Sequence, residues 1–150
     1  MSYRKKFSIK GLKPGSSFSA SLEPVLGYHL KRIYKRAEKY LDQQTAEHLH
    51  NLRIALRRFR YALELYVAGI KPKRFEEVYQ LAVNLQNVLG DRRDVDVMQQ
   101  RLLSLYRVGE AELPALIVAD LEQSKALLNT QIEKTLTDFM RNKQIRKLAG

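Results

Sequence analysis

The sequence predicts an all-α protein, built as an antiparallel bundle of four to five helices. Apolar residues recur at alternating spacings of three and four along most of the chain, which is the period of one helix face. Glycine and proline interrupt this period where short connections are expected. A length of 150 residues, with 45% hydrophobic and 29% charged residues, is typical of one folded domain. We expect an extended basic lead-in over residues 1–20 and a helical bundle over residues 21–150.

The first two helices are predicted from the caps and breakers that flank their apolar seams. The first is expected to begin after Ser21, a favourable N-cap, with Pro24 in its first turn, where a missing N–H costs no helical hydrogen bond. The second is expected over residues 45–68, because Gly69 and Pro72 end it. The predicted seams are Leu26, Leu30, Ile33, Ala37 and Leu41, then Leu49, Leu52, Leu56, Phe59, Leu63 and Tyr66.

Three further helices are predicted in the second half of the chain. The third ends at Gly90, and Asp91 is expected to cap a fourth, which ends at Gly109. The last begins near Leu113 and runs as far as Arg146, so long that we expect its end to fray or to pack against another molecule. The predicted seams are Phe75, Val78, Ala82, Leu85 and Leu89, then Val95, Met98, Leu102 and Leu105, then Ile117, Leu121, Leu128, Ile132, Leu136 and Phe139.

The composition indicates an acidic partner. The 27 Lys and Arg residues exceed the 16 Asp and Glu residues, which gives a net charge of +11, and this excess repels itself unless an anion relieves it. The absence of cysteine excludes disulfides, cysteine zinc sites and thiol nucleophiles, and it fits a reducing compartment. No apolar run reaches signal-peptide or membrane-spanning length, so we expect a cytoplasmic protein with no membrane contact.

The second predicted helix carries a stripe of basic residues. At about 100° per residue, His50, Arg53, Arg57 and Arg60 fall within an arc of roughly 80° beside the apolar seam, and Arg58 adds charge on another face. The first helix repeats the tendency with His29, Arg32, Arg36 and Lys39, and a short turn makes the two helices neighbours. Like charges one turn apart repel, whereas arginine grips phosphate oxygens in pairs. The clustering therefore favours an anion with many phosphates.

Two sequence motifs resemble one family. The run His50-Asn-Leu-Arg53-Ile-Ala-Leu-Arg57-Arg58-Phe-Arg60 is followed about 30 residues later by Leu89-Gly90-Asp-Arg-Arg93-Asp94-Val-Asp96-Val97. Together and in this order they resemble the conserved-histidine α-helical domain, CHAD, over residues 20–147. The resemblance implies that a basic channel binds inorganic polyphosphate without catalysis by the module, and it suggests association with polyphosphate granules.

The resemblance also implies roles for individual residues. His50, Arg53, Arg57, Arg58 and Arg60 occupy the basic positions of the first motif, and Arg93 occupies that of the second. We expect Arg32, Arg36 and Lys39 to extend the track along the first helix. Asp94 and Asp96 match acidic positions, where we expect helix capping or pairing with arginine and no contact with the anion. No metal or cofactor is expected.

One departure from the family concerns length. The usual domain is about twice as long and contains two bundles, each with its own histidine helix, whereas this chain has one such motif. We expect a homodimer related by a two-fold axis to set two His50 helices face to face and complete the channel. The alternatives are a single bundle that binds in a shallow groove, or a fragment of a longer protein.

Other functions are also compatible with parts of the pattern. Nucleic-acid backbone binding is the main alternative, although the chain has no tryptophan and Tyr61 is the one tyrosine near the arginine stripe that is placed to stack on a base. A histidine phosphoacceptor is less favoured, because the Lys-Gly pair of phosphotransfer bundles is absent after His50. Cations around His50 disfavour a metal ion there, and no pair of carboxylates lies near the stripe to hold magnesium, so we do not expect an enzyme.

Overall fold

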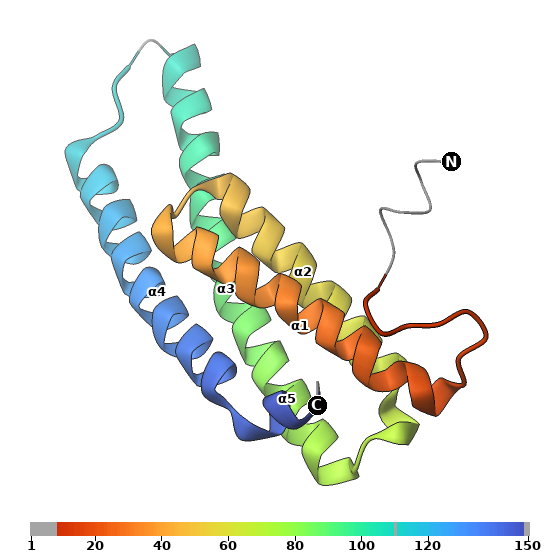
Figure 1. Ribbon diagram of the computed structural model, residues 1–150. Helices are drawn as coiled ribbons and strands as arrows, with labels where there is room; N and C mark the ends of the chain where they lie inside the picture. The colour runs from red at the N-terminus through yellow and green to blue at the C-terminus, as the bar shows by residue number, and fades with distance from the viewer. Residues whose placement is uncertain (1–8, 110, 149–150) are drawn as a thin grey trace.

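The computed structural model describes residues 9–109 and 111–148 and shows an all-α bundle (Figure 1). Its elements are α1 Phe18–Asp42, α2 Ala46–Leu65, the short 3₁₀ helix η1 Val67–Gly69, α3 Pro72–Val108, α4 Ala115–Arg141 and α5 Lys143–Leu148. Within the described ranges no residue lies in a strand. The predicted fold class is confirmed.

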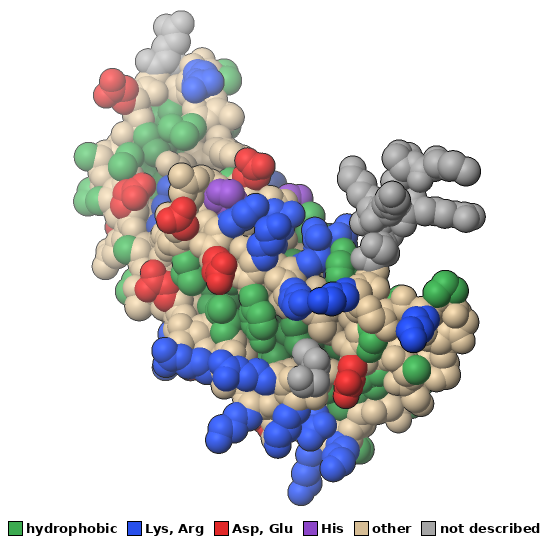
Figure 2. Space-filling view, in the orientation of Figure 1, with side chains coloured by type: hydrophobic (Ala, Val, Ile, Leu, Met, Phe, Trp, Pro, Cys, Tyr) green, Lys and Arg blue, Asp and Glu red, His purple; other side chains and the backbone are tan. Residues whose placement is uncertain are grey.

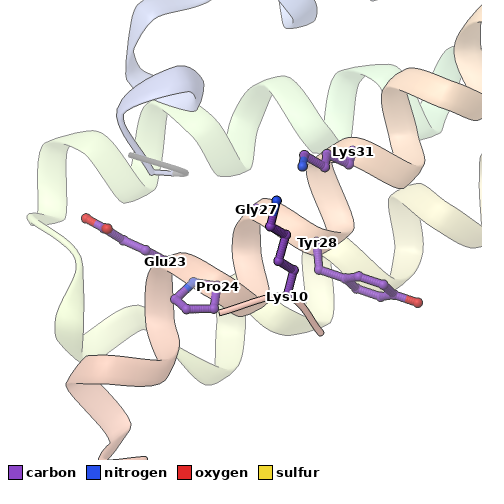
Figure 3. Close-up of a pocket in the computed structure, with 6 residues that line it drawn as sticks. All are labelled: Lys10, Glu23, Pro24, Gly27, Tyr28 and Lys31. Carbon is purple, nitrogen blue, oxygen red and sulfur yellow. The ribbon is translucent and has the colours of Figure 1, made fainter. Parts of the chain in front are cut away.

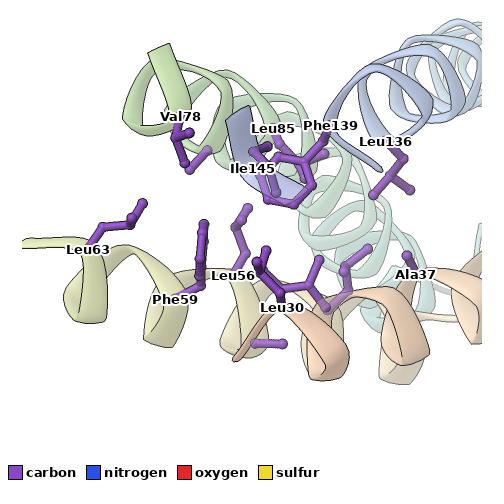
Figure 4. Packing of buried hydrophobic residues seen from close by; sticks show 14 of the residues in the cluster. Leu30, Ala37, Leu56, Phe59, Leu63, Val78, Leu85, Leu136, Phe139 and Ile145 are labelled. Carbon is purple, nitrogen blue, oxygen red and sulfur yellow. The ribbon is translucent and has the colours of Figure 1, made fainter. Parts of the chain in front are cut away.

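The helices form two layers around one apolar core. Helices α1 and α2 pack side by side in one layer, and α3, α4 and α5 cover their inner faces. In Figure 4, side chains from α1 and α2, such as Leu30 and Phe59, point toward those of Leu85 and Phe139 in the opposite layer. The rings of Phe59 and Phe139 meet edge to face with their centroids 6.0 Å apart. The outer faces of α1 and α2 do not take part in this core.

Helix α1 begins earlier than predicted. Ser17 caps it, with the hydroxyl accepting a 3.2 Å hydrogen bond from the Ala20 N–H, whereas Ser21 bonds the hydroxyl of Tyr66 at 2.7 Å. The prediction that Ser21 is the cap was therefore wrong, and Pro24 lies inside the helix instead of in its first turn. The seam ends on buried Tyr40, because Leu41 faces outward with 39% of its surface exposed.

Helix α3 is continuous where two helices were predicted. It runs through Gly90 without a break, so the predictions that Gly90 ends a helix and that Asp91 caps the next were wrong. A glycine inside a helix lowers the stability of the helix by about 1 kcal/mol relative to alanine. Packing of the inward face of α3 on both sides of Gly90, with Leu89 and Arg92 buried, outweighs this cost. Met98 and Leu105, predicted as seam residues, are 56% and 69% exposed.

The last predicted helix is divided in two. Helix α4 ends at Arg141, and the side chain of Asn142 then accepts hydrogen bonds from the N–H groups of Gln144 and Ile145 at 2.9 and 3.1 Å. This cap starts α5 in a new direction, which buries Ile145 and Leu148 against the core. The continuous helix to Arg146 was therefore wrong, and the basic end packs within the chain.

Candidate anion-binding site

Helix α2 lies between α1 and α3, so its outward face has a groove on each side. The α2–α3 groove has a volume of about 360 Å³ and is lined by His50, Arg53, Ile54, Arg57, Gln86 and Arg93. It adjoins a second hollow of about 190 Å³ that shares His50, Arg53 and Arg93 and extends to Asp96, Val97 and Gln100. The structure thus brings the two sequence motifs together, with His50 and Arg53 on one wall and Arg93 on the other.

Arg53 is the most enclosed of the basic side chains in the α2–α3 groove. Its Nε is buried and has no hydrogen-bond partner among the described residues. Burial lowers the pKa of Arg53, and the guanidinium groups of Arg93 and Arg57 lower it further. The carboxylate of Asp94 acts in the opposite direction and is weaker. An anion in the groove would reduce the repulsion between Arg53, Arg57 and Arg93, and it would accept a hydrogen bond from the Nε of Arg53.

The α1–α2 groove lies on the other side of the same helix. It has a volume of about 190 Å³ and is lined by Arg32, Arg36, Asn51, Ile54, Ala55 and Arg58. Ile54 lines both grooves, so it forms the low ridge between them. Consecutive residues diverge at this ridge, because Arg57 lines one groove and Arg58 the other. The predicted binding residues therefore form two adjacent sites and not one continuous row.

His29 belongs to the surroundings of the α1–α2 groove. Burial lowers its pKa, and the nearby charges of Arg58 and Arg32 lower it further. Its Nδ1 is buried without a hydrogen-bond partner among the described residues. The sequence placed His29 in a basic row but gave it no binding role.

Arg60 and Lys39 stand apart from the other predicted residues. Arg60 donates a 2.8 Å hydrogen bond from Nη1 to Gln86 Oε1, and its Nε lies 3.7 Å from Glu64. It therefore supports Gln86, which lines the α2–α3 groove, instead of lining that groove itself. Lys39 is exposed in the last turn of α1 and lines neither groove. Tyr61 is 55% exposed and also lines neither groove.

The groove arginines are not neutralised by the protein. In the described part of the chain, ion pairs involve Arg60, Arg92 and Lys125, and none of the six groove arginines forms one or donates a side-chain hydrogen bond. These six are Arg32, Arg36, Arg53, Arg57, Arg58 and Arg93. Arginines that pair with carboxylates of their own protein usually form an ordinary solvated surface. The six groove arginines have no such partners, so their N–H groups are available to bind an anion.

Arg92 is a structural residue that the sequence prediction missed. It is 6% exposed, donates from Nη1 to Asp96 Oδ1 at 2.6 Å, and donates from Nε to Asn129 Oδ1 at 3.1 Å. Asn129 also accepts from the hydroxyl of Tyr40, so this network joins α1, α3 and α4. The expected pairing of Asp96 with an arginine is confirmed, and the partner is Arg92. With α3 read as continuous, the sequence spacing from Leu85 through Leu89 to Arg92 would have placed this arginine on the inward face.

The lead-in contributes a separate hollow near the start of α1. Lys10, Glu23, Pro24, Gly27, Tyr28 and Lys31 surround a volume of about 310 Å³ (Figure 3). It contains a carboxylate, and its lining includes none of the groove arginines. We therefore do not assign the anion site to this hollow.

Basic side chains gather on two parts of the visible surface. Figure 2 shows Lys and Arg side chains gathered over α1 and over the end of the bundle that contains α5, whereas the far ends of α3 and α4 carry few. Among the described residues, no group of three or more His, Asp or Glu side chains is arranged to hold a metal ion. No helix in the described ranges is both long enough and apolar enough to cross a bilayer.

Comparison with known proteins identifies a family through this same region. The sequence model of the CHAD domain matches residues 5–103, which include α1, α2 and α3 as far as Leu103. Comparisons with curated proteins and with solved structures gave no match. The match covers both motifs and all the residues that line the two grooves on α2, and it spans well over half of the sequence. The chain therefore belongs to the CHAD domain family.

Proposed function

We propose that this protein binds inorganic polyphosphate in the two grooves beside α2. The observation that carries the proposal is the set of six groove arginines, which have neither carboxylate nor hydrogen-bond partners among the described residues. Polyphosphate offers a dense row of oxygens to such donors, and charge-assisted hydrogen bonds of arginine are among the strong ones. Membership of the CHAD family supports this ligand, because the family is associated with polyphosphate.

The course of the bound chain follows from the two grooves. A linear polyphosphate enters between α2 and α3 beside Arg93, crosses α2 at the Ile54 ridge between Arg57 and Arg58, and continues between α1 and α2 to Arg32 and Arg36. His50 donates a ring N–H to it, Arg60 acts through Gln86, and Lys39 adds long-range attraction at the end of α1. The bound polyphosphate thus crosses α2 instead of lying along the axes of α1 and α2.

The proposed role is binding without catalysis. The carboxylate of Asp96 reaches the border of the α2–α3 groove, but it is held by Arg92. Phosphoryl transfer needs ions or donors that stabilise charge on the transferring group together with a positioned base, and no carboxylate is among the residues that line the α2–α3 groove. We infer that the protein holds polyphosphate in the cytoplasm, including on polyphosphate granules.

We further infer that a homodimer is the working form. Both grooves are open on their outer side, so one bundle surrounds the anion on less than its full circumference. A second copy related by a two-fold axis would enclose it. Nucleic-acid backbone binding is the competing function, because a phosphodiester chain meets the same arginines and shows the same salt dependence.

The deciding experiment is a competition titration at two salt concentrations. Long polyphosphate is expected to displace single-stranded and double-stranded DNA at equal phosphate concentration. Arg57→Ala is expected to weaken polyphosphate binding about tenfold, a loss of about 1.4 kcal/mol, with unchanged helix content. Arg141→Ala is the control, because Arg141 is also exposed and lies in the last turn of α4, outside both grooves.

Two results would overturn the assignment. If DNA displaces polyphosphate at both salt concentrations, the protein is a nucleic-acid binder. If Arg57→Ala and Arg141→Ala reduce the affinity equally, binding depends on net charge alone and the grooves have no specific role.

A further inference from the structure

The far ends of α3 and α4 project beyond α1 and α2 as an arm, described over residues 98–109 and 111–127 (Figure 1). The main core includes Leu89 on α3 and resumes at Ile132 on α4, with none of its buried residues between. The one buried side chain in the arm is that of Leu121, among the residues the structure describes there. The arm is therefore a pair of helices that extends past the core of its own bundle.

The arm is unusually apolar on its surface. Seven of the thirteen large hydrophobic side chains that the structure records as exposed lie in it. They are Met98, Leu103, Leu105 and Val108 on α3, and Leu116, Val118 and Leu127 on α4. In Figure 2 this end of the molecule shows hydrophobic side chains with few Lys or Arg. Such a concentration marks a surface that is covered in the working protein.

The exposed side chains surround the arm instead of lining one side of it. At about 100° per residue, Leu103 lies roughly 140° from Met98 around α3, and Val118 lies roughly 160° from Leu116 around α4. A helix that is apolar on several faces is stable when other helices surround it. Helices that lie on a bilayer surface are usually rich in Lys and Arg on their polar face, whereas this arm has more acidic than basic residues, so a bilayer does not fit it.

The charges of the arm favour a second copy of this chain as the partner. Residues 98–127 contain three basic and four acidic residues, a net charge of −1, so the other residues together carry +12. The net positive charge of the rest of the chain therefore disfavours contacts between two copies outside their arms. The arm is also self-complementary, because Arg101 and Arg107 lie on α3 whereas Asp120 lies on α4, together with Glu122 and Lys125, which pair with each other.

We propose that two copies associate through their arms, which form a four-helix bundle about a two-fold axis with α3 of each copy against α4 of the other. A two-fold interface requires such self-complementarity, since every contact occurs twice. The exposed apolar side chains on the facing side of each arm become buried, and the basic α3 edge meets the acidic α4 edge. This contact lies outside both grooves, and the inference does not rest on polyphosphate as the ligand.

Sedimentation equilibrium over a wide range of concentration tests the proposal on the full chain without added anion. The wild type is expected to be dimeric, and its association is expected to strengthen as NaCl is added, because salt screens the repulsion between the two positive bundles. This dependence is opposite to that of phosphate binding, which salt weakens. A wild type that stays monomeric at both low and high salt would refute the interface.

Matched variants locate the contact. Leu105→Glu with Leu116→Glu is expected to weaken association at least a hundredfold at unchanged helix content, since it introduces a charge on each arm helix. Leu65→Glu is the control, because Leu65 is 65% exposed, close to the 69% of Leu105, but lies at the end of α2. Equal weakening by both changes, or continued dimerisation of the arm variant, contradicts the proposal.

A charge exchange tests the orientation of the two arms. Arg101→Glu alone is expected to weaken the dimer, and adding Asp120→Arg is expected to restore it. Additive weakening by the two changes would contradict the pairing of α3 with α4. Each variant is also titrated with polyphosphate, because arm residues lie outside the grooves. Polyphosphate binding by a monomer would refute the dimer and leave the proposed function standing, whereas a dimer that binds none would do the reverse.

Discussion

Arg92 and Asp96 form an ion pair beside the α2–α3 groove, with 2.6 Å between Nη1 and Oδ1. Arg92 is buried, whereas the carboxylate of Asp96 borders the hollow that contains His50 and Arg93. The pair therefore keeps a negative charge neutralised beside the site that we assign to an anion.

Removing one partner of this pair is expected to affect both stability and binding. Arg92→Met leaves Asp96 and Asn129 without their buried donor and should lower the free energy of unfolding by about 3 kcal/mol. It should also weaken polyphosphate binding, because the freed carboxylate repels phosphate. Arg92→Met with Asp96→Asn should recover the affinity. Urea denaturation and titration of both variants provide the measurements, and equal affinities of both variants would show that Asp96 does not influence the groove.

Groove arginines should oppose stability while they promote binding. Arg53 and Arg57 are one turn apart on α2, a spacing at which like charges cost about 0.2–0.5 kcal/mol. Arg53→Gln should therefore leave the free protein as stable as the wild type or slightly more stable, while it weakens polyphosphate binding about tenfold or more. Thermal denaturation with and without polyphosphate measures both effects. A less stable variant would mean that Arg53 is a structural residue.

His29 should make the stability of the free protein depend on pH. Its pKa in the folded protein is lowered by burial and by Arg58 and Arg32, so the unfolded chain takes up its proton first as pH falls. The stability contribution is complete above the unfolded value of about 6.5 and is lost as pH falls below it. His29→Gln should reduce the fall in melting temperature between pH 7 and pH 5. Identical pH profiles of wild type and variant would contradict the assignment.

Bound polyphosphate should favour the protonated form of His29. Phosphates beside Arg32 and Arg58 compensate the two charges that disfavour protonated His29. Affinity is therefore expected to increase from pH 7 to pH 5 in the wild type and to increase less in His29→Gln. Titrations at the two pH values provide the measurement.

Gly90→Ala should stabilise the protein by about 0.5–1 kcal/mol. Gly90 lies inside continuous α3, and an added Cβ would meet no atom within 4 Å. Gly69→Ala is the comparison, since a Cβ there would lie 2.9 Å from Leu22 Cδ1, so this gain is not expected. Chemical denaturation decides, and destabilisation by Gly90→Ala would indicate that the helix does break at this glycine.

The sequence predicted the seams of the bundle well where two layers face each other and less well at helix ends. Leu26, Leu30, Ile33 and Ala37 are buried as expected because their period continues over several turns. The prediction at Gly90 was wrong because the low helix propensity of glycine favours the end of a helix there, whereas packing on both sides of Gly90 keeps α3 continuous. Asn142 was missed because its cap is recognised only when Ile145 is known to turn inward.

The candidate site shows a similar division. The spacing of His50, Arg53 and Arg57 fixed their common side of α2, and the structure places all three in one groove. The sequence could not reveal that Arg60 is engaged by Gln86, because residue 86 comes from another helix. Nor could it separate the sites of Arg57 and Arg58, which depends on the position of α1 and α3 on either side of Ile54.

The unbroken course of α3 has a mechanical consequence. Gln86 and Arg93 in the groove wall and Leu105 in the arm lie on one rod with no hinge between them. The arm and the side of the groove that holds Arg93 are therefore parts of one continuous helix, and a force applied to the arm is transmitted along α3 toward the groove.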